Sequence, residues 1–111
     1  MAAESLVGAR VLVTGAGCVG SRLVSALAAN EAKEIRVLDS SAERLATLGA
    51  GIEPVVGDIT NPGAVRDALD GIDVVFHTAA VLEGNDIAAY HHVNHTGTEV
   101  LARAALAASV R

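Results

Sequence analysis

The 111-residue chain has few of the residues that mark secreted, membrane-spanning or nucleic-acid-binding proteins. Its single cysteine, Cys18, excludes an internal disulfide and fits a reducing compartment. No apolar run approaches the roughly 18 residues of a membrane span, and no basic leader precedes an apolar stretch at the N-terminus. The 8 Lys and Arg residues are scattered and outnumbered by 13 Asp and Glu, whereas phosphate neutralisation needs clustered positive charge. We therefore expect a cytoplasmic protein that binds neither membranes nor nucleic acid.

Aromatic residues are equally scarce, because Phe76 and Tyr90 are the only ones in a chain that is 51% hydrophobic. The core must therefore be built from Val, Leu, Ile and Ala, which is typical of parallel sheets covered by helices. A chain of this length fits one domain with a single modest core. We expect one domain over residues 1–111.

Short apolar runs alternate with apolar residues at helical spacing along the chain. The runs predict strands over 10–14, 35–38, 52–56 and 72–76. Helices are predicted over 18–29, after Ser40 or Ser41, after Asn61, and from about 86 to 110. In the first helix Val19, Leu23 and Leu27 lie four residues apart and should form the buried face.

Repeated strand–helix units of this kind are joined by right-handed crossovers and form a parallel sheet. We therefore expect an α/β fold, a Rossmann-type doubly wound parallel sheet of about four βα units. The doubly wound arrangement places the strands in the order 3-2-1-4. The strand over 72–76 should then lie at an edge of the sheet.

A glycine-rich turn, Gly15-Ala16-Gly17-Cys18-Val19-Gly20, separates the first predicted strand from the first predicted helix. In this context GxGxxG is typical of dinucleotide-binding proteins. Gly15 permits the sharp turn, Gly17 lets the backbone approach a pyrophosphate, and Gly20 lets the helix pack closely on the strand. Cys18 and Val19 lie at the helix N-terminus, whose N–H groups and partial positive charge suit that anion. The alternative is a tight turn that binds no ligand.

Asp39 stands nineteen residues beyond Gly20, at the carboxyl end of the second predicted strand, and Ser40 follows it. An acid in this place can hold both ribose hydroxyls of NAD and would repel the 2′-phosphate of NADP. The sequence therefore predicts NAD as the cofactor, with NADP less favoured. Two alternatives stay open, because Asp39 and Ser40 can simply begin a helix and Arg44 can compensate a phosphate.

These motifs resemble those of the extended short-chain dehydrogenase/reductase family. Val11-Leu12-Val13-Thr14-Gly15 is similar to the opening strand and turn of that family. Three later segments are similar in order and spacing: Gly57-Asp58-Ile59, Phe76-His77-Thr78-Ala79-Ala80 and Val93-Asn94-His95-Thr96-Gly97-Thr98. The His-Thr-Ala-Ala-Val form is particularly similar to the hydroxysteroid dehydrogenase/isomerase and sugar-nucleotide epimerase branches.

The resemblance implies roles for residues outside the glycine turn. Asp58 would bond the adenine amino group, and Ile59 would pack on the adenine ring. The segment Thr78-Ala79-Ala80 would run beneath the ribose and nicotinamide end of the cofactor. Asn94 would bond across to the central strands.

Two features depart from the family pattern. The turn is GxGxxG instead of GxxGxxG, one residue shorter between its first two glycines. Catalysis in the family uses a Tyr-x-x-x-Lys pair, whereas the only tyrosine here is Tyr90 and the only lysine is Lys33. We therefore expect no catalytic residue within these 111 residues.

The resemblance implies the NAD-binding portion of an NAD-dependent oxidoreductase or epimerase that acts on a secondary alcohol or ketone, in a steroid or sugar-nucleotide type of substrate. The alternative is a non-catalytic Rossmann module that binds nucleotides or senses redox state. The long last helix is a candidate homodimer contact. His91 and His95 lie four apart on it, but His92 stands where zinc enzymes have Glu, so we expect no metal site, even with His77 as a third ligand.

Overall fold

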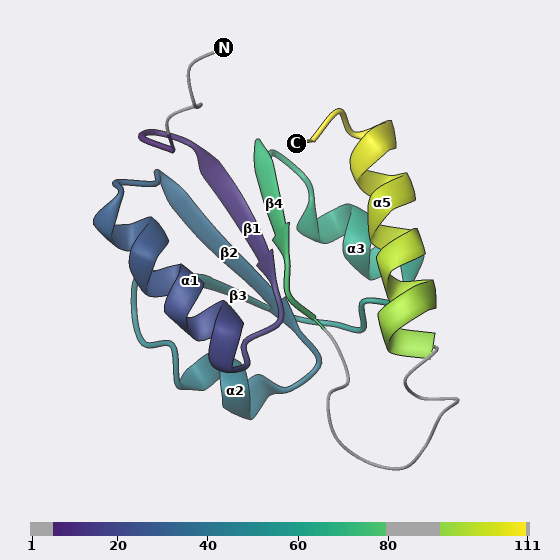
Figure 1. Cartoon of the computed structure of the whole chain (residues 1–111), viewed down its shortest axis with the longest axis horizontal. Coiled ribbons are helices and arrows are strands. Elements are labelled where there is room, and N and C mark those ends of the chain that lie inside the picture. The colour runs from purple at the N-terminus through teal and green to yellow at the C-terminus, as the bar shows by residue number, and fades with distance from the viewer. Residues whose placement is uncertain (1–5, 80–91, 111) are drawn as a thin grey trace.

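The computed structural model describes residues 6–79 and 92–110, and its centre is a four-stranded parallel sheet. The strands are β1 (Arg10–Thr14), β2 (Glu34–Asp39), β3 (Glu53–Val56) and β4 (Val74–His77). They lie in the order β3-β2-β1-β4, so the predicted order 3-2-1-4 is confirmed. The arrows of the strands run the same way, and their carboxyl ends therefore meet at one edge of the sheet (Figure 1).

Helices cover both faces of the sheet (Figure 1). On one face lie α1 (Cys18–Ala29) and α2 (Ala42–Ala46). On the other lie α3 (Pro62–Ala68) and α5 (Thr98–Ala107), and α5 is preceded by the π-helical turn η1 (His92–Gly97). This two-sided covering explains why the central strand reads as a continuous apolar run instead of an alternating one.

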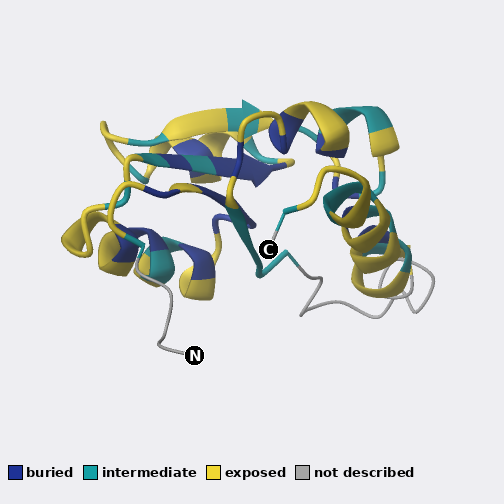
Figure 2. Ribbon diagram, turned by 90° about the horizontal axis from the view of Figure 1, so that it is seen from above, coloured by how far each residue is buried: buried dark blue, intermediate teal, exposed yellow. Residues whose placement is uncertain are grey.

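The central strand β1 supplies apolar side chains to two separate cores, one on each face of the sheet, instead of the single core expected from the length of the chain. Val11 and Val13 are fully buried in the cluster beneath α1 and α2, where Leu27 of α1 joins them. Leu12, also fully buried, points to the opposite face and joins Val65 of α3 in the second cluster. Alternate residues of a strand point to opposite faces, so these three consecutive residues tie both layers to β1. The buried strands form the middle layer in Figure 2.

Two short helices begin at side-chain caps. The hydroxyl of Ser41 accepts a hydrogen bond from the backbone N–H of Arg44, so Ser41 and not Ser40 caps α2. The amide oxygen of Asn61 accepts hydrogen bonds from the N–H groups of Gly63 and Ala64, as expected for the cap of α3. Both caps follow a strand at the edge of the sheet where the strands end.

The structure corrects the predicted buried face of α1. Leu27 is buried and Leu23 packs against the same cluster, as predicted, but Val19 is 64% exposed. The other buried residues of this helix are Gly20 and Val24. The face is rotated toward Gly20 because the absence of a side chain there lets the helix pack closely against the turn that precedes it.

The last helix also differs from its prediction, which was a helix from about Asp86 to Val110. The first part of that range lies outside the described residues. Where the description resumes, the chain forms η1 and then α5, whose C-cap is Ala108. Ser109 has a φ of 57°, and the N–H of Val110 donates to the carbonyl of Ala105 at 2.9 Å. This is the geometry of a left-handed helix terminus, which ends α5 before Val110.

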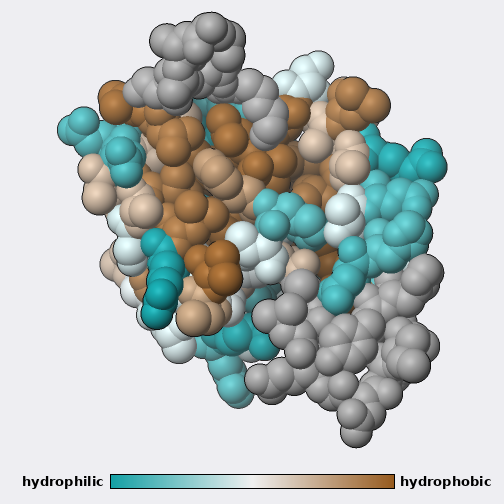
Figure 3. All heavy atoms as spheres, viewed as in Figure 1, coloured by the Kyte–Doolittle hydropathy of each residue, from teal (hydrophilic) through white to brown (hydrophobic). Residues whose placement is uncertain are grey.

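The strand β4 lies at an edge of the sheet, as predicted, and among the described strands it pairs with β1 alone. Its four residues are half-buried. Apolar side chains gather across the middle of this face of the molecule, around the edge strand (Figure 3). None of the helices within 6–79 and 92–110 has the length and apolar character needed to cross a membrane.

Candidate functional site

A pocket of about 310 Å³ lies at the edge of the sheet where the four strands end. Its walls come from the turns that follow β1, β2 and β3, from the segment after β4, and from η1. They are formed by Gly15, Gly17, Cys18, Val19, Gly20, Leu38, Asp39, Ser40, Arg44, Gly57, Asp58, Ile59, Thr78, Ala79 and Val93. Such a crevice, at the point where the strand order reverses between β1 and β4, is the usual ligand position in doubly wound sheets.

The structure brings all but two of the predicted site residues to this pocket. Ala80 lies outside the described residues. Asn94 lies in η1, is exposed, and is not among the lining residues. The lining residues that the prediction left out include Leu38 and Gly57, which directly precede the acids at the ends of β2 and β3. Their position in the sequence is the signal that could have found them.

The three glycines of the turn differ sharply in their surroundings. Gly15 has a φ of 94°, and a Cβ there would lie 2.9 Å from the backbone nitrogen of Ala79. A Cβ on Gly20 would lie 2.0 Å from the carbonyl oxygen of Gly15. Gly17, the N-cap of α1, has ordinary φ and ψ angles of −79° and −159°, and a Cβ on this residue would have no neighbouring atom within 4 Å. Gly15 and Gly20 are thus required by packing within the protein, whereas Gly17 leaves space in the pocket wall.

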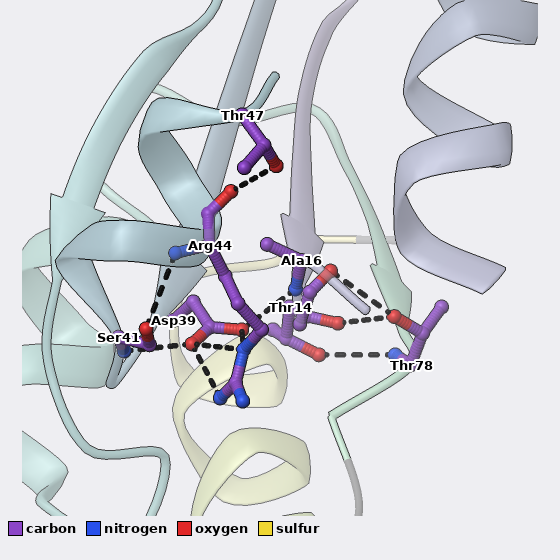
Figure 4. Close-up of polar contacts among 8 residues, drawn as sticks. Thr14, Ala16, Asp39, Ser41, Arg44, Thr47 and Thr78 are labelled. Carbon is purple, nitrogen blue, oxygen red and sulfur yellow. Dashed lines mark hydrogen bonds and ion pairs between the residues drawn. The ribbon is translucent and has the colours of Figure 1, made fainter. Parts of the chain in front are cut away.

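Asp39 is buried at the carboxyl end of β2, with its side chain only 5% exposed. One carboxylate oxygen, Oδ2, accepts a hydrogen bond from the N–H of Ala16 at 2.7 Å, and Oδ1 accepts one from the N–H of Ser41 at 2.7 Å. The guanidinium of Arg44 approaches the same carboxylate, with Nη2 2.8 Å from Oδ1 (Figure 4). Burial raises the pKa of Asp39, but these hydrogen bonds outweigh it and hold the pKa below its usual value. Asp39 is therefore a carboxylate at neutral pH.

Asp58 and Ile59 form the part of the pocket that follows β3. Oδ1 of Asp58 accepts hydrogen bonds from both the N–H and the hydroxyl of Thr60, at 2.8 and 2.7 Å. These bonds lower the pKa of Asp58, which is exposed. The other oxygen, Oδ2, takes no part in them. Ile59 is buried, and a Cβ on Gly97 would lie 2.7 Å from its Cγ2 atom. Close approach at Gly97 therefore holds the last helix against this wall.

The segment after β4 is bonded to the end of β1. The hydroxyl of Thr78 donates to the carbonyl of Thr14 at 2.6 Å, and the N–H of Thr78 donates to the same carbonyl at 2.9 Å (Figure 4). Thr78 Oγ1 also lies 3.3 Å from the carbonyl oxygen of Gly15. These bonds place Thr78 and Ala79 directly beside the glycine turn.

His77 links the same strand end to α5 through two hydroxyl groups. The hydroxyl of Thr98 donates to the carbonyl of Asn94 at 2.8 Å, so its oxygen must accept from Nε2 of His77 at 2.9 Å. In a neutral ring Nδ1 then accepts from the hydroxyl of Thr14 at 2.7 Å. The hydroxyl oxygen of Thr14 in turn accepts from the N–H of Thr78 at 3.1 Å. This chain of bonds suits neutral His77, because Thr14 Oγ1 already accepts from the N–H of Thr78 and, at 3.4 Å, from the N–H of Ala79, which leaves its hydroxyl proton to be donated to Nδ1.

We expect stability to fall as pH is lowered through the range where histidine titrates. Burial lowers the pKa of His77, so between its folded and unfolded values the unfolded chain binds the proton that the folded chain resists. The free energy of unfolding should therefore decline as the pH falls through the usual histidine pKa of about 6.5 and below it. Urea unfolding across this range measures the decline. His77→Gln removes this titration and should flatten the dependence; an unchanged slope in that variant would contradict the assignment to His77.

Metal binding finds no support in the described part of the chain. No group of three or more His, Cys, Asp or Glu side chains is placed there to hold an ion. His77 is engaged by Thr14 and Thr98, and His91 lies outside the described residues. Cys18, the first residue of α1, is exposed in the pocket wall.

Comparison with known proteins identifies the family of the chain. The model of the 3-beta hydroxysteroid dehydrogenase/isomerase family matches residues 11–111. Sterol demethylase protein B of Methylococcus capsulatus is 36% identical over 103 residues, which cover 90% of this chain and 31% of that protein. A 3 beta-hydroxysteroid dehydrogenase/Delta 5→4-isomerase of Mycobacterium tuberculosis is 44% identical over 75 residues, covering 67% of this chain and 20% of that protein. The chain thus spans less than a third of the length of these relatives.

Solved structures agree with the overall fold and with the predicted family. A short-chain dehydrogenase/reductase superfamily protein from Agrobacterium tumefaciens with bound NAD is 35% identical, with a TM-score of 0.76 over 92% of this chain and 30% of that one. A short-chain dehydrogenase from Burkholderia cenocepacia in complex with NADP is 29% identical, with a TM-score of 0.78 over 95% of this chain and 50% of that one. The Rossmann-type fold and the family are therefore confirmed. The chain belongs to the 3-beta hydroxysteroid dehydrogenase/isomerase family, within the extended short-chain dehydrogenases.

Proposed function

We propose that the pocket binds NAD, with NADP less favoured, and that the chain is the dinucleotide-binding part of an NAD-dependent oxidoreductase or epimerase. The observation that carries the proposal is the contrast within the glycine turn. Protein atoms exclude a side chain at Gly15 and Gly20, whereas Gly17 lines the pocket and a Cβ on it would meet no atom within 4 Å. A pyrophosphate fits that space, because the N–H groups at the start of α1 would face it.

The remaining walls suit the other parts of a dinucleotide. Asp39 and Ser40 lie where the adenosine ribose would be held, at the end of β2. Oδ2 of Asp58 would accept from the adenine amino group while Thr60 holds Oδ1, and Ile59 offers an apolar wall for the ring. Thr78 and Ala79 would line the nicotinamide side, together with Ala80, which lies outside the described residues. Asn94 does not line the pocket, so its proposed role is to bond across to the central strands and not to contact the cofactor.

When bound, the cofactor supplies a nicotinamide ring that accepts or donates a hydride. We assign to this chain the binding and orientation of the cofactor and no proton transfer, because its 111 residues hold no Tyr-x-x-x-Lys pair. The substrate of the whole protein is proposed to be a secondary alcohol or ketone of the steroid or sugar-nucleotide type. The family match and the two relatives named above support the steroid type of substrate. A homodimer contact through α5 stays a prediction.

Cofactor binding is tested by thermal unfolding of the chain with and without saturating NAD. A ligand at about 100 times its dissociation constant adds roughly 2.7 kcal/mol of stability. For a domain of this size that corresponds to an upward shift in Tm of at least about 10 °C. ADP-ribose should produce most of the shift, and nicotinamide mononucleotide little, because most of the lining residues surround the adenosine and pyrophosphate. A cooperative transition that none of these ligands shifts would overturn the proposal.

A second candidate is a nucleotide-binding or redox-sensing module without chemistry, which the absence of a Tyr-x-x-x-Lys pair favours only if the whole protein also lacks that pair. Both candidates predict the same shift in Tm with NAD. The two candidates differ in whether the whole protein contains catalytic residues and in whether it catalyses a reaction. A Ser and a Tyr-x-x-x-Lys pair elsewhere in the parent protein support the enzyme. Binding of NAD by a parent protein that lacks such a pair supports the module.

A further inference from the structure

His77, the last residue of β4, connects the end of β1 to the last helix. Its Nδ1 lies 2.7 Å from the hydroxyl oxygen of Thr14, and its Nε2 lies 2.9 Å from the hydroxyl oxygen of Thr98. Thr14 is fully buried at the end of β1, and Thr98 is the first residue of α5. The ring is not itself a lining residue of the pocket, so any effect on a bound ligand must pass through these neighbours.

The hydroxyl of Thr14 is the group through which His77 can act on the pocket wall. This oxygen accepts from the N–H of Thr78 at 3.1 Å and from the N–H of Ala79 at 3.4 Å. A hydroxyl has two acceptor lone pairs and one proton, so its proton is left for Nδ1 of neutral His77. Ala79 lines the pocket, and a Cβ on Gly15 would lie 2.9 Å from its nitrogen. The hydroxyl thus holds Ala79 against the glycine turn.

Protonation of His77 is incompatible with this arrangement. An imidazolium carries a proton on Nδ1 as well, and that proton would be a third donor to the hydroxyl oxygen of Thr14. One of the two bonds from backbone N–H groups must then be given up. Thr78 keeps a second bond, from its N–H to the carbonyl of Thr14 at 2.9 Å, so the loss falls on Ala79. A proton on one ring nitrogen therefore changes how a residue of the pocket wall is held.

Other charged groups do not account for the state of this ring. The charged and titratable residues on the elements around it are Arg10 of β1, His92 and His95 of η1, and Glu99 and Arg103 of α5. Glu99 and Arg103 pair with each other at 3.1 Å, and Arg10 lies at the far end of β1. Burial is the cause of the lowered pKa of His77, and no charged group among the described residues contributes to it. The two histidines of η1 enter the test as controls.

From these contacts we propose that His77 is a positioning residue whose neutral ring keeps Ala79 in the pocket wall, so that protonation of the ring weakens binding of the nicotinamide half of the dinucleotide. The adenosine and pyrophosphate half is bound by the other walls and should be insensitive to the ring. The affinity for NAD relative to that for ADP-ribose, which lacks nicotinamide, therefore reports on this wall. The inference rests on the proposed function, because it needs the nicotinamide side of the cofactor at Ala79.

Calorimetric titration of the wild-type chain with NAD and with ADP-ribose at decreasing pH tests the inference. The series should extend well below the usual histidine pKa of about 6.5, because burial lowers the pKa of His77. The ratio of the two dissociation constants cancels titrations that affect only the adenosine half. The advantage of NAD over ADP-ribose should fall by about fivefold as the ring is protonated, which is the effect of one lost hydrogen bond. By linkage, NAD and not ADP-ribose should raise the acid dissociation constant of His77, followed by NMR, about fivefold.

Variants separate this role from a purely structural one. His77→Gln can offer an amide oxygen to Thr14 and an amide N–H to Thr98 without titrating, so it should keep the advantage of NAD at every pH. Thr14→Val keeps the shape but removes the hydroxyl, and it should lower that advantage about fivefold even at neutral pH, whereas the matched Thr14→Ser should preserve it. His92→Gln and His95→Gln remove the other described histidines and should show the pH dependence of the wild-type chain.

A ratio that does not change with pH in the wild-type chain would overturn the inference. The same conclusion would follow from wild-type pH dependence in His77→Gln, or from an undiminished advantage of NAD in Thr14→Val. If both ligands were lost together at low pH, at a constant ratio, His77 would act only on the stability of the fold, and the inference would again be wrong. A chain that binds neither ligand at neutral pH would overturn the proposed function itself, and the inference with it.

Discussion

Substitution of Gly20 by alanine is expected to destabilise the chain by about 3 kcal/mol or more, because overpacking against fixed atoms has this order of cost. The new Cβ would lie 2.0 Å from the carbonyl oxygen of Gly15 and 2.9 Å from its carbonyl carbon. Both are backbone atoms of the turn, and Gly15 is itself bonded to Leu38 of β2 through its N–H at 2.7 Å. Relief of the overlap would have to move α1 away from the sheet. Thermal or urea unfolding measures the loss.

This loss of stability is the opposite of what helix propensity predicts for the same substitution. Alanine is the better helix former by about 1 kcal/mol, so helix propensity alone would predict that Gly20→Ala stabilises α1. Gly63→Ala in the first turn of α3 is the matched control, since its Cβ would meet no atom closer than 3.4 Å. The control should leave Tm unchanged or slightly raised. If the Gly20→Ala variant were as stable as the control, α1 would not pack closely on the glycine turn, and this prediction would be contradicted.

Substitution of Gly17 by alanine is expected to have the opposite pattern, an intact fold with impaired cofactor binding. The φ and ψ angles of Gly17 suit alanine, and its Cβ would meet no protein atom within 4 Å. The loss of a glycine from the N-cap position should cost at most about 1 kcal/mol. In the pocket, however, the methyl group would take the space proposed for the pyrophosphate. We expect the affinity for NAD to fall by at least about tenfold, measured by calorimetry.

Gly63→Ala again serves as the control for binding, because it makes the same change away from the pocket lining. It should bind NAD as the wild-type chain does. The two turn variants also control each other, since Gly20→Ala reports on packing and Gly17→Ala on the ligand. If Gly17→Ala bound NAD with wild-type affinity, the pyrophosphate would not approach the backbone at this residue, and the proposed orientation of the cofactor would be wrong.

Local patterns were sufficient for much of the architecture. The predicted first strand has the bounds of β1, and the Asn61 cap and the strand order are confirmed. These features depend on residues within one turn or one strand, or on the handedness of crossovers. The error at Val19 arose because a spacing of four residues fits two adjacent helical faces. Contact with the turn, and not the apolar pattern, selected the face that contains Gly20.

Contacts between distant segments could not be predicted in the same way. His77 and Thr98 are 21 residues apart, and their bond depends on where α5 crosses the end of β4. The pairing of Arg44 with Asp39 was also not predicted, although the two residues are only five positions apart. The pairing depends on where β2 ends, how the chain turns after it and where α2 begins, and these could not be predicted from the sequence with the accuracy that a hydrogen bond needs.

The sequence by itself determined the α/β class, the strand order, the glycine turn and an acid at the end of the second strand, because each follows from short-range periodicity or from residue types at fixed spacing. The tertiary structure decided which of those residues face a common pocket, and which partners they have there. It divided the glycines into two that packing requires and one that faces the pocket. It also showed that Asp39 is not an isolated anion but forms an ion pair with Arg44. The physical reason is that charge and steric exclusion act through space, between groups that only the folded chain brings together.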